Sequence, residues 1–264
     1  PPPPPPPPFQ AEDGIRDKRG GLVGSEMCIR DSEGVSVRHL LQMASGVQWN
    51  ETYTEPTSDR RALLEAQIAQ QPGAMLQVMA ALSRAAEPGT RWKYSTGETQ
   101  VVAALVAAAT SKTLSDYLSE KVWANFGMEA DANWWLDSPN GTEVGGSGLS
   151  ATLRDYARFG VFLLDQGVVD GEQIIPEGWI EAASTPKMIG ETVVPYGYMF
   201  WPVEDTEAEI HRGAYEALGI FGQGLYVNPR ENVVIAIWSA RSKPLGSTPI
   251  KDLDVFAAIC QAVR

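Results

Sequence analysis

Few side chains in this 264-residue sequence could form a nucleophile and a base at a fixed spacing. No G-x-S-x-G stretch is present, because Gly145-Gly-Ser-Gly-Leu149 lacks the last glycine, and this argues against an α/β-hydrolase. The one S-x-x-K stretch is Ser184-Thr-Pro-Lys187. A working serine–lysine pair needs a helix that begins at the serine and presents the lysine one turn later. Because Pro186 interrupts such a helix, we expect this pair to be inactive.

The sequence contains two histidines and two cysteines. A Ser-His-Asp triad would have to use His39 or His211. His39 lies in the apolar run Val37 to Leu41, where a histidine with a structural hydrogen bond is expected, whereas the role of His211 stays open. Together with Cys28 and Cys260, these residues supply too few ligands for a structural zinc site. We therefore expect chemistry without a metal or cofactor.

Tyr94 has the most informative surroundings of any single residue. It ends a short extended stretch after the predicted turn Glu87-Pro-Gly-Thr90, and Ser95-Thr-Gly-Glu98 after it is a capping box that begins a helix. Rigid structure therefore holds the phenol beside the positive end of a helix dipole. A phenol with its pKa near 10 exchanges protons only where cationic neighbours lower that pKa. Tyr94 is thus either a proton shuttle or a core tyrosine beside a cap.

The elements that position Tyr94 are mostly helical up to Gly197, and strands follow. One predicted helix begins after Ser58 and presents Leu63, Leu64 and Ile68 on one face, and another begins at Pro176. The other predicted helices span residues 37–43, 74–85, 99–111, 114–126, 153–166 and 249–263, and residues 222–228 and 232–240 form a hairpin. Helices first, then antiparallel strands and a closing helix, imply one α+β domain over residues 33–264.

Three stretches, taken in order and spacing, resemble the serine β-lactamase and penicillin-binding-protein superfamily. They are VSVRHLLQMASG at 35–46, PGTRWKYSTG at 88–97 and GGSGLSATLRDYARFG at 145–160. GEQIIPEGWI at 171–180 and GIFGQ at 219–223 resemble its class C-like branch, which includes esterases and 6-aminohexanoate-dimer hydrolases. The resemblance covers residues 33–264 and implies a β-lactamase/DD-peptidase-like fold, with a helical cluster and an antiparallel sheet.

This resemblance also implies roles for four residues. The superfamily uses S-x-x-K, Y-x-N and K-T-G or a variant, and Tyr94-Ser-Thr96 matches the second element with Thr96 in place of asparagine. Tyr94 would shuttle protons, and Thr96 would contact the substrate through a single hydroxyl. Gly219 falls in the third element, where it would lie against the substrate, and the Ile220 backbone N–H would donate to the oxyanion. Alternatively, Gly219 marks a strand bulge.

Residues 1–32 are predicted to be foreign to this domain and without stable structure. Pro1 to Pro8 is a homopolymer, and residues 9–32 show no periodicity and no signal-peptide pattern. QAEDGIRD at 10–17 and LVGSEMCIRDS at 22–32 resemble in-frame translations of sequencing-library adapters, although a natural proline-rich arm is the alternative. The superfamily's S-x-x-K would fall in this region, about thirty residues before V-R-H-L-L. We therefore expect an N-terminally truncated, inactive fragment without its nucleophilic serine and lysine.

The sequence favours a parent serine hydrolase that forms an acyl-enzyme with a small ester or amide. A D-Ala-D-Ala peptidase or β-lactamase is disfavoured because Ala217 and Leu218 replace the lysine and threonine of K-T-G. A noncatalytic binding or sensor relative is the third alternative. The net charge of −12 argues against nucleic acid as a partner. The compartment and the oligomeric state have no signal in the sequence.

Overall fold

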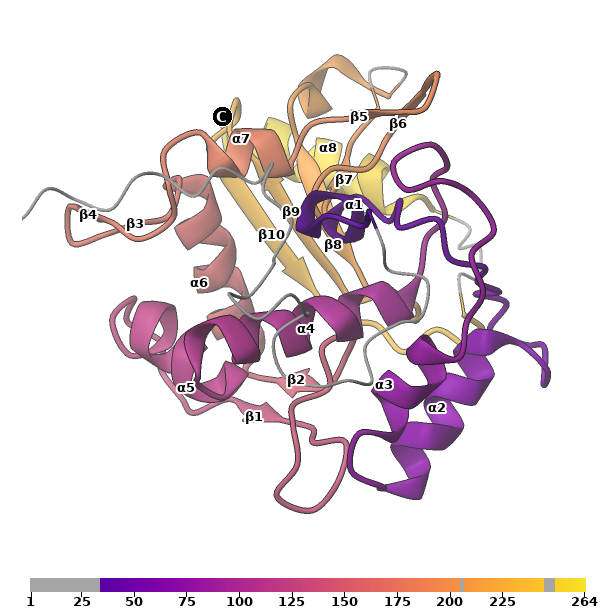
Figure 1. Cartoon of the computed structure of the whole chain (residues 1–264). Helices are drawn as coiled ribbons and strands as arrows, with labels where there is room; N and C mark the ends of the chain where they lie inside the picture. Colours follow the sequence, from indigo (N-terminus) through magenta and orange to yellow (C-terminus); the bar gives the residue numbers. More distant parts are fainter. Residues whose placement is uncertain (1–33, 205–206, 245–249) are drawn as a thin grey trace, which may run out of the picture.

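The computed structural model describes residues 34–204, 207–244 and 250–264, and the predicted foreign segment lies outside these ranges (Figure 1). Its centre is an antiparallel sheet made of β7 (Trp201–Pro202), β8 (Tyr215–Leu218), β9 (Gly224–Asn228) and β10 (Val233–Ile237). The spatial order is β10-β9-β8-β7, so each strand pairs with its neighbour in sequence. Helices α6 (Leu153–Leu164) and α8 (Asp252–Ala262) pack against this sheet. This arrangement confirms the predicted α+β fold.

Strand β9 is buried on both faces. Its side chains alternate between the two faces, and a helix covers each of them. Leu225 and Val227 pack with Phe162 of α6 in one hydrophobic cluster. Tyr226 packs with Phe256 and Cys260 of α8 in another, and Cys260 has no exposed surface. The sheet is therefore the middle layer between two helices, and Cys260 is a small residue of its core.

A second layer is helical and is built around α4 (Thr96–Thr110). The helices near it are α1 (Val37–Leu41), α2 (Asp59–Ala69), α3 (Ala74–Ala80) and α5 (Leu114–Leu118), and a π-helical turn (Ser119–Trp123) continues α5. Their shared core contains Leu40, Trp49, Leu63, Met75, Met79, Val101 and Val144. Figure 1 shows α4 crossing the molecule in front of the sheet, with α2 and α3 on the side of α4 that is away from the sheet.

Helix α2 corrects one prediction about packing. Ser58 does cap it, and Leu63 is buried, but Ile68 is 62% exposed. Gln67 lies one turn after Leu63 and is buried in its place. Ile68 is five residues after Leu63 and therefore points to a different side of the helix.

The structure also contains short elements that the sequence pattern did not predict. They are the two-stranded pairs β1 (Asn133–Trp134) with β2 (Leu149–Ser150), β3 (Val168–Val169) with β4 (Glu172–Gln173), and β5 (Lys187–Ile189) with β6 (Thr192–Val194). Strands of two or three residues are too short to show a period of two. Helix α7 (Trp179–Ala183) begins three residues after Pro176, behind Gly178 in a left-handed conformation. Across the described ranges, no helix has the length and apolar content needed to span a bilayer.

Candidate active site

The three motif stretches meet at the N-terminal end of α4. The Ser45 hydroxyl, from residues 35–46, donates to the Glu98 carboxylate at 2.7 Å. Gly146, from residues 145–160, lies against Thr96 so closely that a Cβ there would be 2.7 Å from Thr96 Cγ2. Gly145 N–H donates to Gln100 Oε1 at 2.8 Å. Contacts between distant parts of the chain therefore fix this helix end, which follows Tyr94 directly.

Ser95 is the N-cap residue of α4, as predicted. Its hydroxyl accepts the Glu98 N–H at 3.2 Å, and its backbone is extended while Thr96 begins the helix. The Glu98 carboxylate, which a capping box would direct back to Ser95, instead bonds to Ser45. Helix α4 therefore begins three residues earlier than the predicted Thr99.

Tyr94 lies in an aromatic cluster formed by Trp92, Tyr94, Tyr196 and Trp201. Its ring centroid is 6.0 Å from that of Tyr196 and 5.6 Å from that of Trp201. Burial raises the pKa of the Tyr94 phenol, and the nearby Glu51 carboxylate raises it further, whereas Arg60 lowers it less. The described residues therefore do not supply the cationic surroundings that would ionise this phenol. The phenol of Tyr94 is therefore neutral in this setting.

Glu51 is the residue next to Tyr94 that the sequence analysis missed. Its carboxylate accepts the Thr96 N–H at 2.9 Å, the Thr96 hydroxyl at 2.5 Å and the indole N–H of Trp49. The guanidinium of Arg60 lies 3.9 Å away, and the Glu51 side chain is 13% exposed. A carboxylate bound to a backbone N–H in the first turn also interacts favourably with the helix dipole. The hydroxyl that Thr96 was expected to offer to a substrate is thus donated to Glu51.

Glu98 adds a buried carboxyl group beneath this helix end. The residue is 2% exposed, and its Oε2 atom is buried without a hydrogen-bond partner. Burial raises the pKa of Glu98 to about 8, although the Ser45 hydroxyl opposes this shift. The carboxyl is therefore mostly protonated at neutral pH.

Gly219 and Ile220 lie in the turn between β8 and β9. This turn follows Leu218, which forms the last residue pair of the two strands with Gly224. Gly219 N–H donates to the Gln223 carbonyl at 2.8 Å, so Gly219 belongs to the turn and not to a strand bulge. Ile220 N–H makes no hydrogen bond to any described residue, which leaves it available as a donor. Within the described ranges, no hydrogen bond or ring contact joins this turn to Tyr94.

Ser184 and Lys187 do not form the helical serine–lysine arrangement. Ser184 follows α7 as its C-cap, and its hydroxyl points to the Glu181 carbonyl at 3.5 Å. The Lys187 ammonium bonds to the Ala182 carbonyl and, at 3.0 Å, to the Thr185 hydroxyl. These contacts confirm that the serine does not open a helix that carries the lysine.

Both histidines have structural hydrogen bonds. His39 Nδ1 accepts the Ser36 N–H at 3.2 Å, which completes the N-cap of α1. His211 is 2% exposed, and its Nδ1 lies 2.8 Å from the Tyr226 hydroxyl. Neither ring contacts a serine nucleophile in the described chain. No group of three His, Cys, Asp or Glu side chains in the described ranges could hold a metal ion.

Comparison with known proteins agrees with the predicted fold and family. The model of the beta-lactamase family matches residues 28–258. The 6-aminohexanoate-dimer hydrolase of Paenarthrobacter ureafaciens is 29% identical over 227 residues, which cover 80% of this chain and 56% of that protein. This chain thus spans little more than half the length of that relative.

Two solved structures show the same architecture. A protein of Bacillus anthracis, provisionally named a 6-aminohexanoate-dimer hydrolase, superposes with a TM-score of 0.69 at 26% identity and covers 86% of this chain and 60% of that one. A penicillin-binding protein of Bacillus halodurans superposes with a TM-score of 0.64 at 18% identity, over 88% of this chain and 75% of that one. The family match covers most of the sequence and agrees with both structures. The chain belongs to the beta-lactamase family.

Proposed function

We propose that the protein is part of a serine hydrolase that cleaves a small ester or amide through an acyl-enzyme. The observation that carries this proposal is the position of Tyr94 at the capped start of α4, where the three family motifs converge. The similarity to a 6-aminohexanoate-dimer hydrolase makes a linear amide the first substrate class to test. We further propose that residues 33–264 form the hydrolase domain and that residues 1–32 are foreign to it.

The reaction begins when a serine hydroxyl attacks the carbonyl carbon and forms a C–O bond. The Ile220 N–H donates to the oxyanion of the tetrahedral intermediate, because a backbone donor works with any side chain. Tyr94 gives its proton to the leaving group as the C–N or C–O bond breaks. The proton released by the serine passes through a lysine to the phenolate and restores neutral Tyr94. Water then attacks the carbonyl carbon of the acyl-enzyme. The same groups take its proton and return one to the serine as the ester bond to the serine breaks.

We propose that the serine and the lysine of this mechanism lie outside the residues that the structure describes. The sequence has one S-x-x-K stretch, Ser184 to Lys187, and its side chains are engaged elsewhere. We propose that the catalytic serine and lysine lie upstream of V-R-H-L-L in a longer parent protein. The 264-residue chain then does not turn over esters.

The test compares this 264-residue chain with a longer protein that also carries the upstream segment recovered from the parent gene. We expect p-nitrophenyl acetate turnover only from the longer protein, with a burst of p-nitrophenolate equal to the enzyme concentration. A burst from the shorter chain that Ser184→Ala abolishes and Tyr94→Phe does not would overturn the proposal. An upstream segment without S-x-x-K would favour the noncatalytic relative. Faster turnover of a penicillin or of a D-Ala-D-Ala peptide than of a linear amide would favour the β-lactamase or peptidase.

A further inference from the structure

A small cavity of about 100 Å³ lies beside the stretch that leads into α4. Its lining consists of residues 46–49 together with Ala85, Ala86, Arg91 and Lys93. Sites for drug-sized molecules have volumes of about 300 to 1,000 Å³, whereas one water molecule occupies about 30 Å³. The cavity therefore suits a single small ion or the end group of a larger ligand.

The charged side chains that line this cavity are both cationic. Exposure alternates along residues 91–94, since Trp92 and Tyr94 pack in the aromatic cluster, whereas Arg91 and Lys93 are exposed and line the cavity. Successive side chains of an extended chain face opposite sides, so Arg91 and Lys93 share one side. Neither of these two side chains forms an ion pair or a hydrogen bond with a residue that the structure describes.

The carboxyl groups near the cavity are engaged or neutral. Glu87 lies one residue beyond the cavity lining, and its carboxylate is 3.6 Å from the Arg84 guanidinium. The Glu51 carboxylate accepts N–H groups from the start of α4 and from the indole of Trp49. Burial raises the pKa of Glu98 to about 8, so that this carboxyl is mostly protonated. These groups therefore leave the charges of the two lining cations uncompensated.

Backbone donors add to the two cations. The N–H groups of Gly46, Trp49 and Arg91, which all line the cavity, make no hydrogen bond to any residue in the described ranges. The Gly46 carbonyl, in contrast, already accepts the N–H groups of Ala85 and Ala86, at 2.7 and 3.0 Å. The lining therefore offers donors and positive charge to a ligand.

We propose that this cavity binds phosphate, either as the free ion or as the end group of a phosphomonoester. A phosphate group with a charge close to −2 matches the two cations. The Arg91 guanidinium pairs with two of its oxygens, and the Lys93 ammonium acts as a point charge. The volume admits the phosphoryl group and leaves the rest of a larger molecule outside. A carboxylate gains less, because it has one negative charge and two oxygens.

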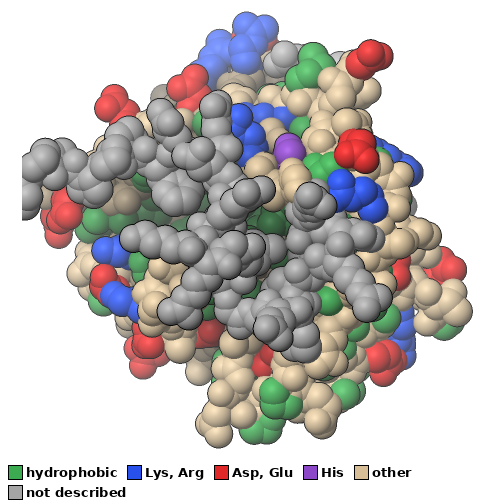
Figure 2. Space-filling view, in the orientation of Figure 1, with side chains coloured by type: hydrophobic (Ala, Val, Ile, Leu, Met, Phe, Trp, Pro, Cys, Tyr) green, Lys and Arg blue, Asp and Glu red, His purple; other side chains and the backbone are tan. Residues whose placement is uncertain are grey.

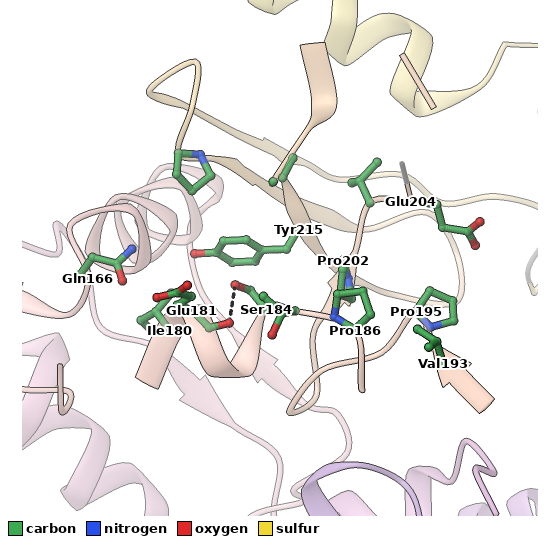
Figure 3. A pocket seen from close by; sticks show the side chains of 15 residues that line it. Gln166, Ile180, Glu181, Ser184, Pro186, Val193, Pro195, Pro202, Glu204 and Tyr215 are labelled. Atoms are coloured by element: carbon green, nitrogen blue, oxygen red, sulfur yellow. Dashed lines mark hydrogen bonds between the residues drawn. The ribbon is translucent and has the colours of Figure 1, made fainter. Parts of the chain in front are cut away.

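The cavity beside α7, with a volume of about 710 Å³, offers no such selection by charge (Figure 3). Glu181 lines it, whereas the Lys187 ammonium bonds to Thr185 of the same wall, so that both signs of charge lie there. The lining of the smaller cavity contains no carboxylate. Charge complementarity therefore favours an anion at the smaller cavity.

Trp49 separates the phosphate cavity from the candidate active site. It lines the cavity and is 5% exposed, and its indole N–H donates to Glu51, which holds the first turn of α4. A phosphate in the cavity therefore changes the surroundings of the Trp49 indole. This provides a signal for binding that does not depend on enzymatic activity.

The experiment is an NMR titration of the ¹⁵N-labelled chain with inorganic phosphate, phenyl phosphate and acetate, each compared with sodium chloride at equal ionic strength. We expect saturable shifts of the Val47, Ala86 and Lys93 amides and of the Trp49 indole with phosphate. Acetate should bind about two- to fivefold more weakly, since it lacks the attraction of one charge. Equal binding of both phosphates identifies the phosphoryl group as the ligand, and binding of inorganic phosphate alone identifies the free ion. Both results support the proposal.

Substitutions of exposed cations test the contacts. Arg91→Gln and Lys93→Gln should each weaken phosphate binding about two- to fivefold, the effect of one exposed ion pair. Lys243→Gln is the matched control, because Lys243 is an exposed cation outside the cavity lining. It changes the net charge by the same amount and should leave the affinity for phosphate unchanged.

Three results would overturn this proposal. Acetate binding as tightly as phosphate would show that the cavity does not select a dianion. Unchanged phosphate affinity in both Arg91→Gln and Lys93→Gln, or an equal loss in Lys243→Gln, would show that the two lining cations do not hold the ligand. Shifts that sodium chloride reproduces, or that are confined to residues outside the cavity, would show that phosphate does not bind there.

Discussion

Burial favours the neutral form of Tyr94, and the charge of Glu51 favours it further. The carboxylate stabilises the first turn of α4 through Thr96 and disfavours a tyrosinate next to it. A tyrosine that acts as a base needs the opposite surroundings. In the proposed mechanism Tyr94 therefore acts as the proton donor, and the proposed lysine supplies the cation for the other half of the cycle.

For the parent enzyme with its upstream segment, Tyr94→Phe should lower kcat by about 10²- to 10⁴-fold, the usual contribution of a general acid or base. The free energy of unfolding should fall by only about 1 kcal/mol, since a single hydroxyl is lost. Ser95→Ala is the matched control, because it removes the N-cap hydroxyl next to Tyr94. It should cost about 0.5 to 2 kcal/mol of stability and leave most of kcat intact.

Ester kinetics and denaturant unfolding of the two variants check this contrast. If Tyr94→Phe kept its kcat and lost stability, Tyr94 would be a core tyrosine, and the site assignment would lose its main support.

Glu51→Gln should lower the pKa of Tyr94, because it removes the negative charge beside the phenol. The amide also cannot accept hydrogen bonds with both ends, so stability should fall by about 1 to 3 kcal/mol. NMR of the chain with ¹³Cζ-labelled tyrosine follows the titration, and Glu172→Gln, in exposed strand β4, is the control. A Tyr94 pKa that is the same in both variants would contradict the proposed influence of Glu51.

At the scale of secondary structure, the start of α4 depends on a buried carboxyl group. Glu98 has a pKa of about 8 in the folded chain, above its value of 4.5 in an unfolded one. The folded state therefore binds one proton more than the unfolded state between these values, and its stability falls as the pH rises through this range. Above about pH 8 this contribution no longer changes.

Glu98→Gln should remove this pH dependence, because its amide stays neutral and can still accept the Ser45 hydroxyl. As the pH rises from about 4.5 to about 8, the unfolding free energy of the unmodified chain should fall relative to that of the variant, by up to about 1.4 kcal/mol per pH unit. Urea unfolding of both proteins from pH 5 to pH 9 measures it. A difference that does not vary with pH would mean that the Glu98 carboxyl titrates normally.

The elements that the sequence predicted best are those with local signals. The cap residues Ser36, Ser58, Ser95 and Thr152 each accept the N–H three residues later in the chain, so local sequence places these helix starts to within about one turn, as the three-residue shift of α4 illustrates. Glu51 had no such signal, since its partner Thr96 is 45 residues away. The pairing of two-residue strands likewise depends on tertiary contacts and could not be predicted from periodicity.

At the scale of the whole molecule, the acidic charge on the face seen in Figure 2 is not concentrated in one patch. Figure 2 shows Asp and Glu side chains spread around the visible face, with Lys and Arg between them. Exposed ion pairs such as Arg61 with Glu65 and Arg154 with Glu129 join the two signs at the surface. Their individual contributions to stability are small, about 1 kcal/mol or less, and they weaken further in salt.

Limited proteolysis tests the proposed domain boundary. Residues 1–32 contain no periodic apolar face, and Pro1 to Pro8 cannot join a helix or a central strand. We expect trypsin to cut at Arg16, Lys18, Arg19 and Arg30 first and to leave the remainder intact. The melting temperature should not change after this cleavage. Protection of residues 10–32 to the level of the core would contradict the boundary.

Strand β10 is the outermost strand on one side of the described sheet, paired with β9 alone. Its other side presents backbone N–H and C=O groups that water or a further strand must satisfy. The sequence Val-Val-Ile-Ala-Ile contains neither the charges nor the proline with which proteins usually block such an edge. This edge is a template for β-augmentation, on which an extended segment from elsewhere in the polypeptide or from a second copy can add a fifth strand.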